Sequence, residues 1–81
     1  MVAAGLKMYP NPATDWLVID LGSDEEELQS VHIHQASGQL RLHQQTTGTQ
    51  QCRLDISTLE KGNYFVQINT NVGTVVRQIN K

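Results

Sequence analysis

The protein has 81 residues, a formal net charge of −2 and six lysine and arginine residues scattered along its length. A single domain is expected from this length, and the absence of a basic cluster argues against nucleic acid as a partner. The lone cysteine, Cys52, excludes an intramolecular disulfide bond. No apolar run approaches the length of a transmembrane helix.

The opening sequence, MVAAGLK, lacks the basic segment followed by an apolar segment that marks a signal peptide. Residues 1–5 are therefore interpreted as a linker or an expression remnant, and the domain is expected to span residues 6–81. If the protein leaves the cytoplasm, its export address is expected upstream of this segment.

The first predicted strand, Leu6–Tyr9, leads into the sequence Tyr9-Pro10-Asn11-Pro12. Proline fixes φ and has no N–H, so Pro10 and Pro12 are unsuited to the centre of a sheet. Each also favours extended geometry in the residue before it. The segment predicts a stiff corner that determines where the next strand enters the fold.

Short runs of alternating apolar and polar residues follow, separated by glycines, which is typical of an all-β protein. The further predicted strands are Asp15–Leu21, Gln29–Ala36, Gln39–Thr46, Gln51–Ser57, Asn63–Thr70 and Thr74–Asn80. Hairpin turns are expected at Ser37-Gly38 and at Asn71–Gly73. These elements predict an immunoglobulin-like antiparallel β-sandwich of about seven strands.

Side-chain alternation within the strands predicts the core. The inward positions are Leu17, Ile19, Leu21, Val31, Ile33, Leu40, Leu42, Cys52, Leu54, Ile56, Tyr64, Val66 and Ile68. Cys52 alternates in phase with Leu54, so we interpret it as a small buried apolar residue and not as a nucleophile. The last strand is ambiguous, because Val75, Val76 and Ile79 do not share one face.

Three histidines are expected on one outward face. If Ser37-Gly38 centres the turn, His32 faces His43, and His34 lies diagonally from His43. Imidazoles are common ligands of zinc and nickel, which makes the three residues weak candidates for a metal site. No carboxylate in the hairpin would orient them, so a plain polar face is preferred and no cofactor is expected. The acidic run of residues 24–27 is interpreted as a solvated loop.

Trp16 and Phe65 stand on the faces opposite to their core neighbours. Both are expected to point away from the main core, which makes them candidates for a contact interface. The alternative is that the last strand or the N-terminal arm covers them.

Three segments in order, YPNPATDWLVI, VHIHQASGQLRL and LDISTLEKGNYFVQINTNVGTVVRQINK, resemble a known family. It is the C-terminal sorting domain of the type IX secretion system of Bacteroidetes (type A, of the Por secretion system family). Its members open with Y-P-N-P, continue with a V-x-I strand, a glycine hairpin and I-x-x-L-x-x-G-x-Y-x-V-x-I, and end on a basic residue. The matching positions are Tyr9–Pro12, Val31, Ile33, Gly38, Ile56, Leu59, Gly62, Tyr64, Val66, Ile68 and Lys81. The resemblance spans residues 6–81, and its weight lies in the order of the motifs, each of which is weak alone.

The resemblance implies a folded tag that carries no catalysis of its own. Its implied partners are the type IX translocon and shuttle components, an upstream cargo domain and a sortase-like cysteine peptidase that removes the tag. The cargo would pass through the periplasm and outer membrane, to be secreted or held at the cell surface. The candidate recognition residues are Tyr9, Pro10, Asn11, Pro12, Gly38, Gly62, Tyr64, Ile79 and Lys81.

The tail, Thr74–Lys81, is expected to be the part that the machinery contacts most directly, with Ile79 and Lys81 reaching outside the fold. An ordinary edge strand with a frayed end is the alternative for this segment. For the whole domain, the alternative is an immunoglobulin-like adhesin or a carbohydrate- or protein-binding module, which would need a polar pocket beside Trp16. Open sheet edges also predict some homodimer in the isolated domain.

Overall fold

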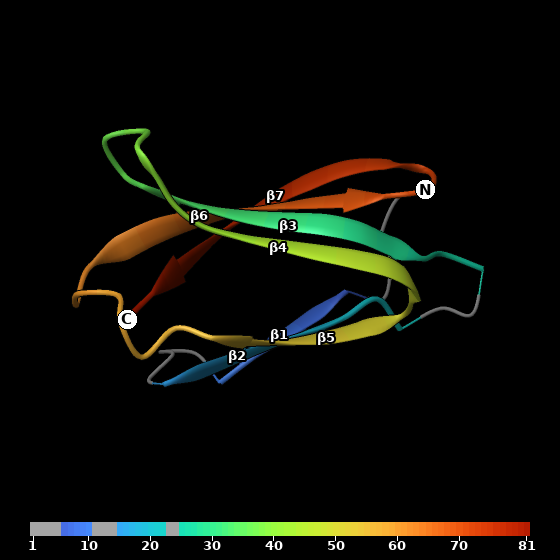
Figure 1. Cartoon of the computed structure of the whole chain (residues 1–81), viewed down its shortest axis with the longest axis horizontal. Helices are drawn as coiled ribbons and strands as arrows, with labels where there is room; N and C mark the ends of the chain where they lie inside the picture. Colours follow the sequence, from blue (N-terminus) through green and yellow to red (C-terminus); the bar gives the residue numbers. More distant parts are fainter. Residues whose placement is uncertain (1–5, 11–14, 23–24) are drawn as a thin grey trace.

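The computed structural model describes residues 6–10, 15–22 and 25–81. Its strands are β1 (Lys7–Tyr9), β2 (Trp16–Asp20), β3 (Leu28–Gln35), β4 (Leu40–Thr49), β5 (Gln51–Asp55), β6 (Asn63–Thr70) and β7 (Gly73–Asn80). A three-stranded sheet, β1-β2-β5, packs on a four-stranded sheet, β4-β3-β6-β7, and all neighbouring strands are antiparallel (Figure 1). The protein is therefore the predicted all-β, immunoglobulin-like sandwich. The predicted linker, residues 1–5, lies outside the described residues, as do Asn11 and Pro12.

The core fills the space between the two sheets. Its buried side chains are Leu17, Ile19, Leu21, Leu28, Val31, Ile33, Cys52, Leu54, Ile56, Leu59, Tyr64, Val66, Ile68, Val75 and Ile79. Most of the core predicted from alternation is thus confirmed, including the inward Cys52. The structure also resolves the ambiguous last strand, because Val75 and Ile79 face inward while Val76 is 53% exposed.

One predicted core residue, Leu40, is wrongly placed by simple alternation. Ile33 pairs with Leu42, as predicted, but the next residue, His34, pairs with Leu40. This register shift places one extra residue, Arg41, in β4 and turns Leu40 to the outward face beside His34. Leu40 is 49% exposed as a result. Leu42 keeps its inward direction but is only partly buried.

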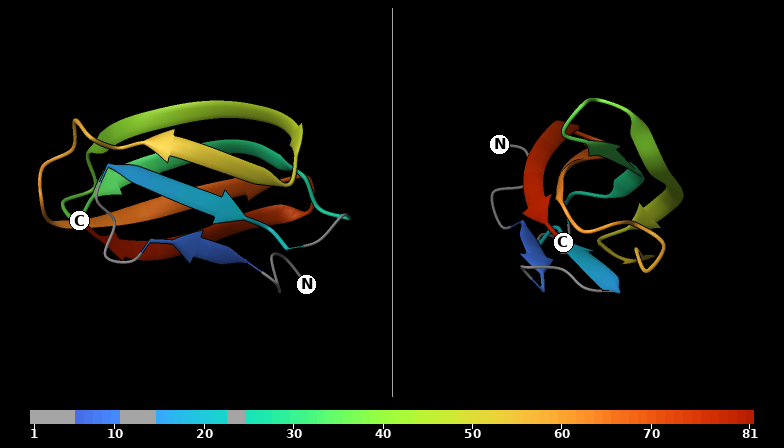
Figure 2. Two further views of the ribbon diagram at one scale, coloured as in Figure 1. Left: turned by 90° about the horizontal axis from the view of Figure 1, so that it is seen from below. Right: turned by 90° about the vertical axis from the view of Figure 1, so that its left-hand side faces the viewer.

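The two sides of the sandwich differ. On one side, β4 passes almost directly into β5, so the chain crosses from one sheet to the other and joins their edges. On the other side, β1 and β7 are the edges of different sheets and no crossing joins them. The end-on view in Figure 2 shows β7 and β1 at one side and the β4–β5 crossing at the other. We call the gap between β1 and β7 the seam.

The acidic run is exposed at Glu25 and Glu27, as expected for a solvated loop, but not at Glu26. Glu26 is buried, with 7% of its surface exposed. The next residue fixes the loop: the Glu27 N–H donates to Asn71 Oδ1 at 2.8 Å, and the Asn71 N–H donates to the Glu27 carbonyl at 3.1 Å. This tie to the β6–β7 turn holds the loop against the body of the domain. In the described part of the chain, no helix is long and apolar enough to span a membrane.

Candidate recognition site

Segments that are far apart in sequence meet at one end of the sandwich, at the left in Figure 1. The β3–β4 turn, the β5–β6 loop and the last residues of the chain all lie there. The turn and the loop line one shallow polar pocket, formed by Gln35, Ala36, Ser37, Glu60, Lys61, Gly62, Asn63 and Tyr64. We call this region the carboxyl-terminal end of the sandwich, and it holds several of the candidate recognition residues.

Lys81 is anchored at this end by both its side chain and its backbone. Its Nζ donates to the carbonyl oxygens of Ile56, at 2.6 Å, of Ser57, at 3.4 Å, and of Leu59. Its N–H and carbonyl pair with the carbonyl and N–H of Gly62, at 2.8 and 3.0 Å. We call the three carbonyl oxygens that receive the ammonium the cradle. A single residue at the end of β7 therefore holds both ends of the β5–β6 loop.

The start of this loop is fixed by an aspartate. The Ser57 N–H and hydroxyl both donate to Asp55 Oδ1, at 3.0 and 2.7 Å. The Ser57 hydroxyl, then its amide, and then the charge of Lys81 hold the pKa of the Asp55 carboxyl below its ordinary value. The turn therefore presents an ionised carboxylate close to the cradle, which complements the ammonium.

Tyr64 holds the same loop from the inside. Its ring is buried opposite Ile79 in the β6–β7 register, and its hydroxyl donates to the Glu60 carbonyl at 2.5 Å. A buried tyrosine needs a partner for its hydroxyl, and here the loop backbone supplies it. A phenylalanine at this position would leave the carbonyl without that donor.

Gly38 and Gly62 are required by their backbone conformations and not by lack of space. Their φ angles are +99° and +154°, and a side chain at either position would meet no atom within 4 Å. Residues with a Cβ rarely adopt such positive φ values. Gly38 closes the β3–β4 turn by donating its N–H to the Gln35 carbonyl at 2.8 Å. Both glycines therefore shape the carboxyl-terminal end of the sandwich.

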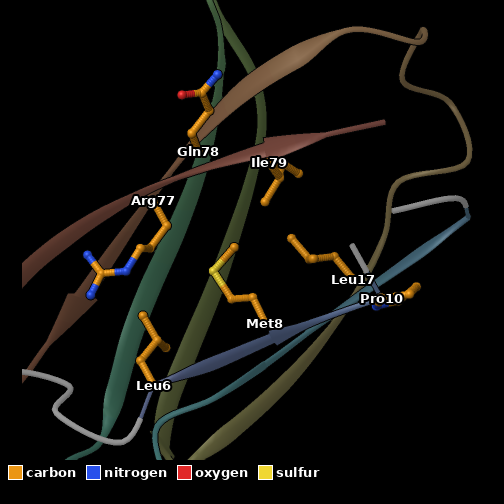
Figure 3. Close-up of a pocket in the computed structure, with 7 residues that line it drawn as sticks. All are labelled: Leu6, Met8, Pro10, Leu17, Arg77, Gln78 and Ile79. Carbon is orange, nitrogen blue, oxygen red and sulfur yellow. The ribbon is translucent and has the colours of Figure 1, made fainter. Parts of the chain in front are cut away.

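Pro10, the first proline of the corner, lies close to the tail across the seam. Pro10 and Ile79 line one pocket there, which has a volume of about 170 Å³ and is shown in Figure 3. Its other lining residues are Leu6, Met8, Leu17, Arg77 and Gln78. Beside it, Tyr9 is 45% exposed, and its hydroxyl oxygen accepts a long hydrogen bond from Gln51 Nε2 at 3.4 Å. Pro10 of the first motif and Ile79 of the tail thus line the same pocket, whose walls are apolar except at Arg77 and Gln78.

Trp16 and Phe65 point away from the core as predicted, but they do not form one patch. Trp16 lies on the outer face of the three-stranded sheet and Phe65 on that of the four-stranded sheet. The Arg53 guanidinium covers the Trp16 ring at 4.1 Å from its centroid. Neither pocket described above is lined by Trp16. Contact through either aromatic side chain stays a prediction, and it would involve two separate surfaces.

The histidines have the predicted register, with His32 opposite His43. Their rings stack, with centroids 4.4 Å apart and planes 13° apart, and the His34 ring lies 6.3 Å from that of His32. Ring lone pairs lie in the ring plane, so stacked imidazoles do not aim at a shared ion. Partial burial, then the neighbouring His43 and His34, lower the pKa of His32. Within the described residues, no group of three or more His, Cys, Asp or Glu could hold a metal ion.

A family model described as the secretion system C-terminal sorting domain matches residues 7–81. The chain belongs to this family. It is a type IX secretion C-terminal sorting domain, a signal that implies interaction with the type IX machinery and export of a cargo to the cell surface or medium. No curated protein matches the chain.

The candidate recognition residues of the sorting domain include both exposed and buried side chains. Tyr9, Pro10 and Gly38 are exposed, whereas Tyr64 and Ile79 are buried and can affect recognition only through the surface that they support. Sequence reasoning missed the cradle, because its acceptors are backbone carbonyls that no residue type reveals. The spacing of Ile56 and Leu59 was an available signal that this turn is anchored in the core.

Proposed function

We propose that the type IX translocon and its shuttle components recognise this domain at the carboxyl-terminal end of the sandwich. The observation that supports this proposal is the meeting of the family motifs there. The glycine turn, the β5–β6 loop and the final residue are separated in sequence but lie together in the fold. A receptor that binds this end would therefore test several motifs in one contact.

The proposed route leads through the periplasm and across the outer membrane. A sortase-like cysteine peptidase then removes the domain from its upstream cargo, which is released or attached to the cell surface. The domain is a substrate in this chemistry. Its core is formed by residues of the domain itself, which supports a tag that keeps the same surface on different cargos.

Fusion of residues 6–81 to a periplasmic reporter is expected to move the reporter to the surface or the medium of a host that has the type IX machinery. The fractions are assayed by immunoblotting, and the mass of the exported reporter shows whether the domain has been removed. The reporter without the domain is the negative control. A fusion that stays in the periplasm, in cells that export the same reporter with a known sorting domain, would contradict the proposed function.

We also propose that the isolated domain forms some homodimer through its open strand edges. The edges β1 and β7 face the seam and are not joined by a crossing, and such edges can pair with a second copy. The dimer fraction measured by light scattering is expected to rise with concentration. Val76→Lys, at an exposed position of β7, should reduce that fraction because a charge on an edge strand opposes pairing. Purely monomeric protein at high concentration would refute this idea.

A further inference from the structure

The ammonium of Lys81 is directed into the domain. A lysine ammonium has three donors, and three backbone carbonyls surround this one, those of Ile56, Ser57 and Leu59. The side chain is only partly exposed. A receptor that bound the ammonium itself would first have to break these contacts, so the charge is poorly placed for direct recognition.

The same contacts join Lys81 to both the start and the end of the β5–β6 loop. The side chain of Lys81 holds residues 56–59, while its backbone pairs with Gly62. Loss of the ammonium would leave the carbonyls of Ser57 and Leu59 to find water, and Lys81 itself, which follows the buried Ile79 by two residues, would keep only its two backbone bonds to Gly62. The last residues of a strand fray readily when few hydrogen bonds hold them.

We propose that Lys81 is a positioning residue, a latch whose ammonium holds the end of β7 against the β5–β6 loop. The sorting machinery recognises the surface that the latch maintains, and it does not contact the ammonium. This inference rests on the proposed function, which it deepens by assigning the final residue an internal role.

Two substitutions of Lys81 distinguish a latch from a receptor that requires only a positive charge at this position. Lys81→Met keeps the unbranched side chain up to the ε carbon position and removes the ammonium. Lys81→Arg keeps the charge, but the planar guanidinium does not present three donors from one nitrogen, so it fits the cradle less well. A latch is expected to fail in the first variant and to be weakened in the second, whereas a receptor that senses charge alone would accept arginine fully.

The strand register allows a substitute latch. Gly62 and Lys81 exchange both of their backbone hydrogen bonds, so the adjacent pair, Asn63 and Asn80, is a non-hydrogen-bonded pair. The Cα atoms of such a pair are about 4.5 Å apart, which lies within the range that a disulfide bridges. Both side chains are exposed, and the remaining Cys52 is buried. Asn63→Cys with Asn80→Cys can therefore tie the end of β7 without an ammonium.

The first test is made in solution, by amide hydrogen exchange followed by NMR. The Gly62 amide donates to the Lys81 carbonyl, so its exchange reports the docked tail. In Lys81→Met it is expected to exchange at least about tenfold faster, and the oxidised disulfide should restore the slow rate in that variant. An unchanged Gly62 rate in Lys81→Met overturns the latch.

The second test uses the reporter fusion, with the disulfide pair in the Lys81 background as the matched control. Export is expected to fall at least about fivefold in Lys81→Met and to recover when the disulfide forms in the oxidising periplasm. If the tail is tied but export does not recover, the ammonium is recognised directly and the proposal is overturned. Full export of Lys81→Met with a frayed tail also overturns it. Failure of the wild-type fusion rejects the proposed function instead, whereas the Gly62 measurement tests the latch independently of export.

Discussion

Deletion of Gln78–Lys81 is expected to lower the free energy of unfolding by at least about 3 kcal/mol, because this tail contributes to the core as well as to the sheet. Ile79 is only 3% exposed and lies opposite Tyr64. Loss of a buried isoleucine side chain costs about 2–5 kcal/mol, and the bonds of Lys81 to the cradle and to Gly62 are lost as well. A domain of this size has a total stability of about 4–12 kcal/mol, so the deletion removes a large part of it.

Urea unfolding, monitored by circular dichroism, measures the loss of free energy of unfolding. In thermal unfolding, the melting temperature should fall by more than about 10 °C. Ile79→Ala should account for most of the loss, whereas Asn80→Ala, at an exposed position of the same strand, should change the stability by about 0.5 kcal/mol or less. A deletion that lowers the stability by only about 1 kcal/mol would contradict the core role of the tail. It would favour the interpretation from sequence alone, in which Ile79 and Lys81 reach outside the fold.

This result would change how export by tail variants is interpreted. If the deletion unfolds the domain, loss of export after deletion says nothing about direct recognition of the tail. Single substitutions that keep Ile79 in place, such as Lys81→Met, are therefore the informative ones. The structure indicates that the tail stabilises the domain, because the Ile79 side chain is buried in the core and the Lys81 ammonium binds backbone carbonyls of the β5–β6 loop.

The strands could be predicted because a half-buried strand shows its two faces directly in the sequence. The same alternation, with the glycine turn, also gave the register that places His32 opposite His43. It identified Trp16 and Phe65 as outward residues. It could not say that they lie on opposite faces of the molecule, because that depends on which sheet each strand joins, and the sequence contains no local signal for sheet membership.

The arrangement of the candidate recognition residues could be predicted only in part, for a related reason. The motif residues Gly62, Tyr64 and Lys81 were identified, but their physical roles depend on backbone atoms. Lys81 donates to the cradle carbonyls and Tyr64 donates to the Glu60 carbonyl. Every residue carries a carbonyl, so the sequence does not distinguish those that a fold turns toward a donor. Resemblance could therefore indicate which residues belong together without indicating what they bind.

Ile33→Ala is expected to destabilise the domain by about 2–5 kcal/mol, whereas Leu40→Ala should change its stability by about 0.5 kcal/mol or less. Simple alternation placed both side chains in the core and would predict similar losses. The register shift in the β3–β4 pairing separates them, because it leaves Ile33 fully buried and turns Leu40 outward to 49% exposure. Leu42, which keeps its inward direction but is partly buried, should fall between the two.

Urea unfolding of the three alanine variants, under identical conditions, tests this order. The comparison is matched because all three residues are aliphatic and lie in one hairpin. Equal losses at Ile33 and Leu40 would show that β4 pairs without the extra residue and that Leu40 is buried. The outward face would then carry the side chain of Arg41 in place of Leu40, since a shift of one residue moves a strand position to the other side of the sheet. The order of the three stability losses therefore tests the β3–β4 register, which determines which side chains lie on the outward face of this hairpin.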